Sequence, residues 1–239
     1  MDQAIVLQAR MGSTRLPGKA LADVDGRPLI WHCIERLRAS GLPVVLATTE
    51  RPDDDMLAAV VEKFGVRVVR GPDRDVLARY AMVAAALGLT TLVRATGDNP
   101  AVDIEAPRRT LALLERIGAD HVVERGLPYG AAVEAIAVEA LMTAADLATD
   151  PYDREHVTPF IRRDPRFRAV SAIAPGELRR PGLRLTVDTA DDLDFMRRLY
   201  AAVTPGASRP APLVELMAAA DRCRMASDGG SGSGARSAR

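Results

Sequence analysis

Apolar and polar positions alternate between two kinds of segment along the first half of the chain. Short apolar runs, typical of buried strands, occur at 4–7, 44–47, 66–69 and 91–94. Between them lie longer segments with apolar residues at helical spacing, which end at Gly41, Gly65 and Gly88. Strand and helix in this order, joined by short turns, predict βαβ units with right-handed crossovers in a mostly parallel sheet.

The pattern becomes less regular in the second half. A helix over 104–117 and a strand over 121–123 are followed by a loop-like stretch and a β-like segment that together cover 124–138. An unpaired edge on that β-like segment would favour pairing with a second chain, so we expect a homodimer. The remaining pattern predicts helices over 139–148, 153–163, 189–203 and 212–225 and strands over 167–173 and 183–187.

Composition bounds the class of protein. The 239 residues are 48% apolar, enough for one globular domain over 1–226, whereas the Gly/Ser-rich stretch 227–239 is predicted to be disordered. Acidic and basic residues number 32 each, and aromatic residues make up 4%, which excludes a general nucleic-acid-binding surface. Two cysteines, no signal peptide and no apolar run of membrane-spanning length predict a cytoplasmic location.

The segment Gln8–Lys19, directly after the first strand, concentrates polar chemistry. It has no apolar periodicity and combines glycines with three cations and two hydroxyls, at Gly12, Gly18, Arg10, Arg15, Lys19, Ser13 and Thr14. Ligands of α/β sheets dock at the carboxyl ends of the strands, so this loop suits a polyphosphate. The alternative is a solvated basic turn.

Two carboxylates are candidate Mg²⁺ ligands, because Mg²⁺ takes one or two protein carboxylates together with phosphate oxygens and water. Asp98 follows a predicted strand in Thr96-Gly97-Asp98-Asn99-Pro100, where the alternative is an Asx turn. Asp188 follows the predicted strand 183–187, where the alternative is a helix cap. Thr189 with Asp192 already resembles a capping box, which leaves Asp188 available. Parallel strands have their carboxyl ends at the same rim of a sheet, so Asp98 and Asp188 should lie close together there.

The loop also carries a family resemblance. It matches neither the P-loop nor the dinucleotide-binding pattern of three spaced glycines. The motif Ala9-Arg10-x-x-Ser13-Thr14-Arg15-Leu16-Pro17-Gly18-Lys19 resembles that of cytidylyltransferases that make CMP-activated sugars. The spore-coat polysaccharide type is the most similar, and CMP-KDO synthetase and acylneuraminate cytidylyltransferase are more distant. The resemblance covers about residues 3 to 200.

The resemblance implies a three-layer α/β protein with a mostly parallel mixed sheet, the nucleotide-diphospho-sugar transferase (GT-A-like) fold. It implies Mg²⁺-dependent transfer of CMP from CTP to a small anionic acceptor, with release of pyrophosphate. The implied catalytic residues are Arg10, Arg15, Lys19 and Asp98, and the implied metal ligands are Asp98 and Asp188. The implied nucleotide-binding residues are Gln8, Ala9, Arg10, Gly12, Ser13, Arg15, Lys19, Thr48, Arg70 and Gly97.

The segment 70–80 is implied to border the nucleotide pocket, and Asp75 and Arg79 have the spacing of an ion pair on a helix surface. The expected acceptor-binding residues are Glu134, Arg154 and His156, although His156 also fits a structural role in the first turn of a helix. His32 and His121 are predicted to be structural.

The acceptor remains open at this stage. The spore-coat subfamily usually has Gly-x-Asp-x-Glu where this chain has Gly130-Ala131-Ala132-Val133-Glu134. Ala132 therefore replaces the expected acid, and nonulosonic acids, KDO-like acids, phosphonates and sugar phosphates are all compatible. Two other functions are also considered. A GT-A-type glycosyltransferase usually has an Asp-x-Asp pair, which is absent at the expected place, and a non-catalytic nucleotide-binding module does not need two distant acidic motifs.

Overall fold

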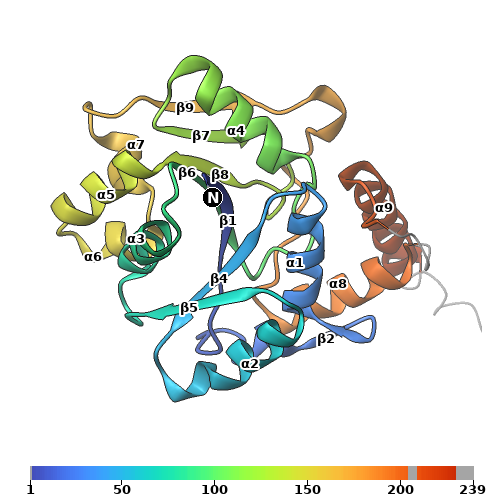
Figure 1. Cartoon of the computed structure of the whole chain (residues 1–239). Helices are drawn as coiled ribbons and strands as arrows, with labels where there is room; N and C mark the ends of the chain where they lie inside the picture. The colour runs from blue at the N-terminus through green and yellow to red at the C-terminus, as the bar shows by residue number, and fades with distance from the viewer. Residues whose placement is uncertain (1, 204–208, 230–239) are drawn as a thin grey trace, which may run out of the picture.

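A mixed sheet runs through the protein with helices on both faces, as Figure 1 shows. The computed structural model describes residues 2–203 and 209–229. Within this part of the chain the sheet has seven strands in the order β5-β4-β1-β6-β8-β7-β9. Their bounds, in sheet order, are Arg67–Gly71, Val44–Thr49, Gln3–Gln8, Thr91–Thr96, Glu134–Ala137, His121–Arg125 and Ala169–Ile173. The first four are mutually parallel, β8 is antiparallel to both of its neighbours, and β9 is parallel to β7.

The helices divide into two layers because alternate residues of each strand face opposite sides of the sheet. Ile5 and Leu7 of β1 belong to one apolar core, and Ala4 and Val6 belong to the other. The first core is covered by α1 (Leu29–Arg38), α2 (Asp55–Lys63), α4 (Ala106–Ile117), α8 (Ala190–Ala201) and α9 (Leu213–Gly229). The second is covered by α3 (Val76–Leu87), α5 (Val138–Leu147) and α7 (Pro159–Arg163), and α6 (Pro151–His156) packs against α3 and α7. The predicted three-layer α/β fold is therefore confirmed.

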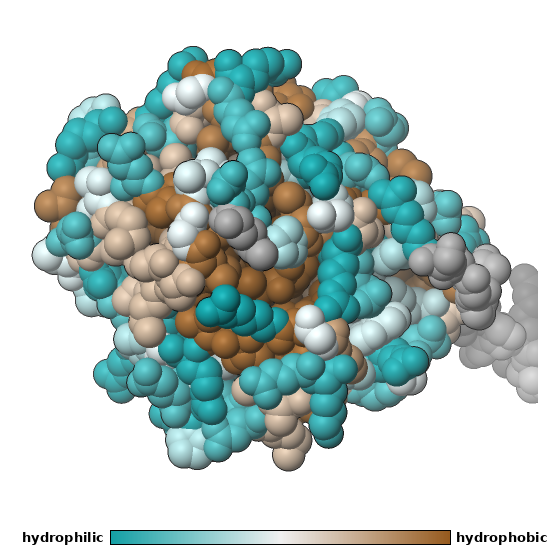
Figure 2. Space-filling model, viewed as in Figure 1, coloured by the Kyte–Doolittle hydropathy of each residue, from teal (hydrophilic) through white to brown (hydrophobic). Residues whose placement is uncertain are grey.

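Smaller elements complete the chain. A two-stranded ribbon, β2 (Asp23–Val24) with β3 (Arg27–Pro28), turns at Asp25-Gly26. Three short 3₁₀ helices span η1 (Lys19–Leu21), η2 (Pro52–Asp54) and η3 (Gly176–Leu178). In the face shown in Figure 2, hydrophilic residues surround a central group of hydrophobic ones, where Figure 1 places the amino end of β1. Within the described residues, no helix has the length and hydropathy needed to cross a membrane.

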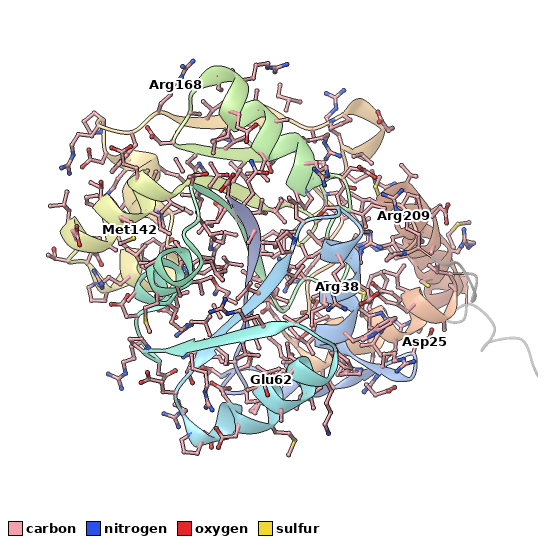
Figure 3. The ribbon with its side chains drawn as sticks, viewed as in Figure 1. Asp25, Arg38, Glu62, Met142, Arg168 and Arg209 are labelled. Carbon is pink, nitrogen blue, oxygen red and sulfur yellow. The ribbon has the colours of Figure 1, made fainter. Side chains whose placement is uncertain are left out.

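The reason given for a homodimer is wrong, because the β-like segment is not at an edge. Strand β8 lies inside the sheet, paired with β6 on one side and β7 on the other. The edge strand on that side of the sheet is β9, which lies beyond β7 and has Ile173 76% exposed. Figure 3 places Arg168, which leads into β9, at the rim of the molecule. The prediction of a homodimer itself stays untested.

Other element boundaries also differ from the predictions. The helix expected over 153–163 is two helices, α6 and α7, which are separated at Val157 with φ 72°. Pro159 has no N–H with which to continue the hydrogen bonds of α6, and it stands instead at the first position of α7. The strand expected over 183–187 is an extended segment with a single bridge from Arg184 to Tyr129.

Two further predictions need adjustment. Glu124 and Arg125 complete strand β7 instead of starting a loop. Helix α9 continues to Gly229 and so passes the predicted start of the tail at Ser227. The rest of that predicted tail, residues 230–239, lies outside the described residues.

Candidate active site

A cavity of about 680 Å³ opens at the carboxyl ends of β1 and β6, beside the first turn of α3. It brings together most of the residues that the sequence suggested, because parallel strands end at the same rim of the sheet. The predicted residues that line it are Gln8, Ala9, Arg10, Ser13, Arg15, Lys19, Gly97, Asp98, Glu134, His156 and Asp188.

Glycines shape the rim of this cavity. Gly18 has φ 74°, a left-handed conformation that favours glycine and turns the loop toward Lys19. Gly97 N donates to the Gln8 carbonyl at 2.8 Å, which ties the ends of β1 and β6 together. A Cβ atom on Gly97 would lie 2.6 Å from the Ala9 Cβ, so only glycine allows this approach. The carboxyl group of Asp98 follows directly after this constrained position.

One ammonium group joins the two predicted metal ligands. Lys19 Nζ donates to the Val187 carbonyl at 2.7 Å, to Asp188 Oδ1 at 3.2 Å and to Asp98 Oδ2 at 3.4 Å. Val187 N in turn donates to the Asp98 carbonyl at 2.8 Å, which holds the two acidic segments side by side. Both carboxylates therefore face the same cavity, as predicted, although Asp188 follows an extended segment and not a strand.

Asp188 is the more strongly held of the two acids. Its carboxylate also pairs with Arg15 at 3.0 Å and with Arg184 at 2.7 Å. Burial alone would raise the pKa of Asp188, but the hydrogen bonds from Arg184 and Lys19 outweigh burial and lower this pKa. Thr189 and Asp192 form the capping box of α8 that the sequence indicated. Asp188 is thus ionised and takes no part in capping the helix.

The carboxylates of Asp98 and Asp188 fit Mg²⁺ bound together with a polyphosphate. No group of three or more His, Cys, Asp or Glu residues is placed to hold a metal within residues 2–203 and 209–229. Mg²⁺ does not need such a group, because one or two carboxylates with phosphate oxygens and waters complete its six positions. Asp98 Oδ1 accepts from Thr96 Oγ1 at 2.6 Å, and its Oδ2 is turned toward Lys19.

The loop Gln8–Lys19 itself is anchored by acidic side chains other than Asp98 and Asp188. Met11 N donates to Asp54 Oδ1 at 2.6 Å, and Asp54 is only 1% exposed. Arg10 pairs with Asp73 at 2.8 Å and lines the cavity. Asp54 lies in η2, and its other carboxylate oxygen accepts from Thr49 Oγ1. Arg15, with a side chain 65% exposed, reaches across to Asp188.

Glu134 belongs to a buried polar network under the cavity. One carboxylate oxygen accepts from Arg94 at 2.7 Å, and the other contacts His121 at 3.2 Å and Thr158 at 3.1 Å. Burial would raise the pKa of Glu134, but Arg94 and His121 outweigh it and lower the pKa to about 2. Both oxygens already have partners in the fold, and His121 is structural, as predicted.

The segment that follows β8 places one predicted residue in the cavity and one outside it. His156 is exposed, lines the cavity and packs on the Tyr152 ring with centroids 4.3 Å apart. Arg154 does not line the cavity, because it pairs with Asp75 at 2.6 Å and donates to two carbonyls of the α5 end. The ion pair between Asp75 and Arg79, the alternative that their spacing allowed, is therefore not formed, and Arg79 donates to the carbonyls of Pro72 and Asp73.

Three predicted nucleotide-binding residues also lie outside the lining of the cavity. Gly12 lines a neighbouring cavity of about 230 Å³. Thr48 is fully buried in β4. Arg70 donates to the carbonyls of residues 49 and 51 and pairs with Asp55 at 2.6 Å. His32 is structural as predicted, since its Nε2 contacts the Val24 carbonyl at 2.7 Å.

The sequence interpretation missed several residues of the lining. They include Arg94 of β6, Asn99 just after β6 and Tyr129 after β7, and also Arg79 of α3, whose segment was expected to border the pocket although the residue itself was not named for it. A signal was present for Arg94, because a charged residue interrupts an otherwise apolar strand. No such signal marks Tyr129, which reaches the cavity through its backbone pairing with Leu183 and Leu185.

The sheet, its two helix layers and the charged cavity at the strand ends define a nucleotidyltransferase of the nucleotide-diphospho-sugar transferase fold. The chain belongs to the cytidylyltransferase family, whose model matches residues 4–217. Membership in this family decides against the glycosyltransferase and the non-catalytic binding module.

Individual relatives agree with this assignment. The spore coat polysaccharide biosynthesis protein SpsF of Bacillus subtilis is 35% identical over 207 residues, which are 83% of this chain and 86% of SpsF. The 3-deoxy-manno-octulosonate cytidylyltransferase of Anaeromyxobacter sp. is 29% identical over 238 residues, covering 83% of this chain and 98% of that enzyme. The structure of a cytidylyltransferase from Leptospira borgpetersenii matches with a TM-score of 0.83 and 28% identity, covering 94% and 96% of the two chains.

Proposed function

We propose that this enzyme transfers CMP from CTP to a small anionic acceptor, a nonulosonic or KDO-like sugar acid, in a Mg²⁺-dependent reaction. The observation that carries the proposal is the position of Asp98 and Asp188 on either side of the Lys19 ammonium, inside a cavity lined by Arg10 and Arg15. Cations for a triphosphate and carboxylates for Mg²⁺ thus occupy one rim.

The reaction is a displacement at the α-phosphorus of CTP. An oxygen of the acceptor forms the new P–O bond, the bond to the bridging oxygen breaks, and pyrophosphate leaves with the electron pair. Such transfer requires mainly positioning and charge neutralisation. Lys19, Arg15 and Arg10 would contact the triphosphate oxygens and stabilise the charge that builds on the leaving group.

Asp98 and Asp188 would hold Mg²⁺, which when bound neutralises phosphate charge and lowers the pKa of the acceptor hydroxyl. Lys19 now bridges the two carboxylates at 3.4 and 3.2 Å. Substrate binding would therefore draw its ammonium from the carboxylates toward phosphate. Arg184 would keep Asp188 oriented, since it bonds the other oxygen of that carboxylate at 2.7 Å.

Support for the acceptor class comes from the relatives and from the cavity. The name of the Anaeromyxobacter relative gives 3-deoxy-manno-octulosonate as its substrate. The cavity wall formed by Pro128, Tyr129 and Gly130 offers an aromatic ring and backbone groups for a sugar. Tyr129 is 61% exposed, and the Arg184 guanidinium carbon lies 5.1 Å from its ring centroid.

We also propose that the enzyme is located in the cytoplasm and forms a homodimer.

The experiment is a pyrophosphate-release screen with the full chain. CTP, UTP, ATP and GTP are each combined with Mg²⁺ and a panel of sugar acids, phosphonates and sugar phosphates, and parallel reactions contain a chelator. The proposal predicts release with CTP and a sugar acid that the chelator stops. Release with a different nucleotide, with a phosphonate or sugar phosphate in place of every sugar acid, or in the presence of the chelator would contradict it.

A further inference from the structure

Arg10 of the loop lines two cavities at once, the candidate active site and the neighbouring cavity of about 230 Å³. The other residues that line this second cavity are Gly12, Arg51, Asp53, Asp54 and Asp73. Arg10 Nη1 donates to Asp73 Oδ1 at 2.8 Å. Lys19 and Arg15, the other two cations of the loop, pair instead with Asp188. Arg10 is therefore held by an acid of the smaller cavity, on the far side of the loop from the metal pair.

The backbone around Asp73 is fixed by neighbouring side chains. The carbonyls of Pro72 and Asp73 accept hydrogen bonds from Nη1 of Arg79, which is 3% exposed. Asp75 follows, and its side chain accepts a hydrogen bond from the backbone of the first turn of α3 at 2.9 Å. Because this segment is held on both sides, separation of Arg10 from Asp73 requires movement of the Arg10 side chain rather than of the backbone around Asp73.

The backbone of the loop is held independently of the Arg10 side chain. Met11 N donates to Asp54 Oδ1 at 2.6 Å, and Ser13 N and Gly18 N donate to the Met11 carbonyl at 2.9 and 3.0 Å. The Arg10 side chain is 39% exposed, so the apolar core does not fix its rotamer. A change of rotamer can therefore move the Arg10 guanidinium while these backbone hydrogen bonds stay formed.

The charge balance of the smaller cavity opposes the departure of Arg10. Acids outnumber arginines in its lining. Asp73 Oδ2 lies 3.5 Å from Arg51 Nη1, and Arg51 also pairs with Asp53 at 3.0 Å. If Arg10 leaves, Arg51 is the arginine of this lining that remains beside the acids. A ligand in the larger cavity must therefore carry concentrated negative charge to draw the guanidinium away, and a polyphosphate has that charge.

We propose that Asp73 makes an autoinhibitory contact with Arg10 and holds its guanidinium away from the phosphate site until a polyphosphate competes for it. The inference rests on the proposed function, because it concerns regulation of the same phosphate loop. Polyphosphates then bind with a lower apparent affinity than a loop with a released Arg10 would give, since the binding-competent arrangement is only partly populated. The contact forms again after the reaction and so favours the release of pyrophosphate.

The test is calorimetry of the full chain with inorganic tripolyphosphate and Mg²⁺, a probe that needs neither a nucleoside nor an acceptor. Asp73→Asn keeps the shape of the side chain and removes the charge that holds Arg10. Tripolyphosphate should then bind about two- to fivefold more tightly, the factor that corresponds to a partly exposed ion pair. Asp53→Asn is the matched control, because Asp53 lines the same cavity and pairs with Arg51 instead of Arg10. Its affinity for tripolyphosphate should stay near the wild-type value.

A double-mutant cycle asks whether Arg10 causes the effect. Arg10→Met should weaken tripolyphosphate binding, and Asp73→Asn added to Arg10→Met should give no tightening. Three results would overturn the inference: unchanged or weaker binding by Asp73→Asn, equal tightening by Asp53→Asn, and tightening that persists in the Arg10→Met background. Tighter binding that depends on Arg10 supports the inference even if CTP and every sugar acid fail to yield pyrophosphate, a failure that contradicts only the proposed function.

Discussion

The ammonium of Lys19 lies 3.2 Å from the carboxylate of Asp188, although the two residues are 169 positions apart in the sequence. The same ammonium lies 3.4 Å from Asp98. A loop cation and two acids from distant segments therefore form one cluster. In this cluster Lys19 supplies the positive charge and the two carboxylates supply the negative charge. In the proposed function, Mg²⁺ would take the place of the ammonium beside the carboxylates, and a triphosphate would take the place of the carboxylates beside the ammonium.

Replacing Lys19 or Arg15 by alanine should weaken nucleotide binding without unfolding the protein. Each cation now compensates a carboxylate and would contact the triphosphate, so each variant should lose roughly 1–3 kcal/mol of binding free energy. Calorimetry with CTP and Mg²⁺ measures this loss. Lys63→Ala is the control, because Lys63 is the other lysine of the chain and is exposed on α2. Unchanged CTP affinity in both Lys19→Ala and Arg15→Ala would contradict the assignment of the loop.

Gly97→Ala should destabilise the protein and lower turnover together. The added methyl group would lie 2.6 Å from the Ala9 Cβ and 3.2 Å from the Gln8 carbonyl, so the ends of β1 and β6 must separate. Overpacking of this kind costs about 1–3 kcal/mol. Chemical denaturation measures the free energy of unfolding, with Gly182→Ala as control, since nothing lies within 4 Å of a Cβ there. Equal stability of the two variants would contradict this packing.

Glu134→Gln should lower stability near neutral pH, because it leaves Arg94 buried without its acid. The loss should be about 3 kcal/mol. The folded-state pKa of Glu134 is depressed to about 2 from an ordinary value of 4.5. Its contribution to stability is thus complete above 4.5 and disappears as the pH falls through about 2.

The measurement for Glu134 is the free energy of unfolding of wild type and variant as a function of pH. The difference between them should be constant above pH 5 or so and shrink steadily at lower pH. A difference that does not change with pH would show that Arg94 and His121 do not lower the pKa of Glu134 in the folded protein. Glu139→Gln, on the first turn of α5, serves as the control.

Much of the fold could be predicted from the sequence, because its signals are local. Apolar runs and helical spacing place β1, β4, β6 and α3 correctly, and Gly88 ends α3 in the left-handed conformation expected of a C-terminal cap. The break at Val157 was missed, although Pro159 could have indicated it. The extended segment before Asp188 has the apolar pattern of a strand, and only its tertiary partners show that no ladder forms.

The residues of the candidate site likewise fall into two groups, those that a local sequence pattern reveals and those that depend on distant partners. Residues in the loop motif and in the two acidic motifs could be found from short, dense patterns. The pairing of Arg154 with Asp75 could not, because it joins α6 to the start of α3 across 79 residues. The burial of Arg79 was missed for the same reason, since a helix-surface ion pair with Asp75 fits the spacing equally well. Partners distant in sequence decide which cations remain available to a ligand.

Light scattering of the full chain should give a dimer mass at micromolar concentration. The expected basis is the free edge of β9, where the backbone is unpaired on one side and Ile173 is 76% exposed. Ile173→Lys should shift the equilibrium toward monomer, because charged side chains oppose pairing between edge strands. A wild-type mass of 25.6 kDa would contradict the homodimer.

The most direct test of the account is pyrophosphate release by Asp98→Asn and Asp188→Asn with CTP, Mg²⁺ and an accepted sugar acid. Each change removes one charge beside Lys19 while keeping the shape of the side chain. Asp191→Asn, an exposed acid three residues further along, is the matched control and should retain wild-type turnover. The account predicts that both site variants stay folded by circular dichroism and lose at least about 100-fold in turnover. Folded Asp98→Asn or Asp188→Asn protein that retains most of the wild-type rate would contradict it.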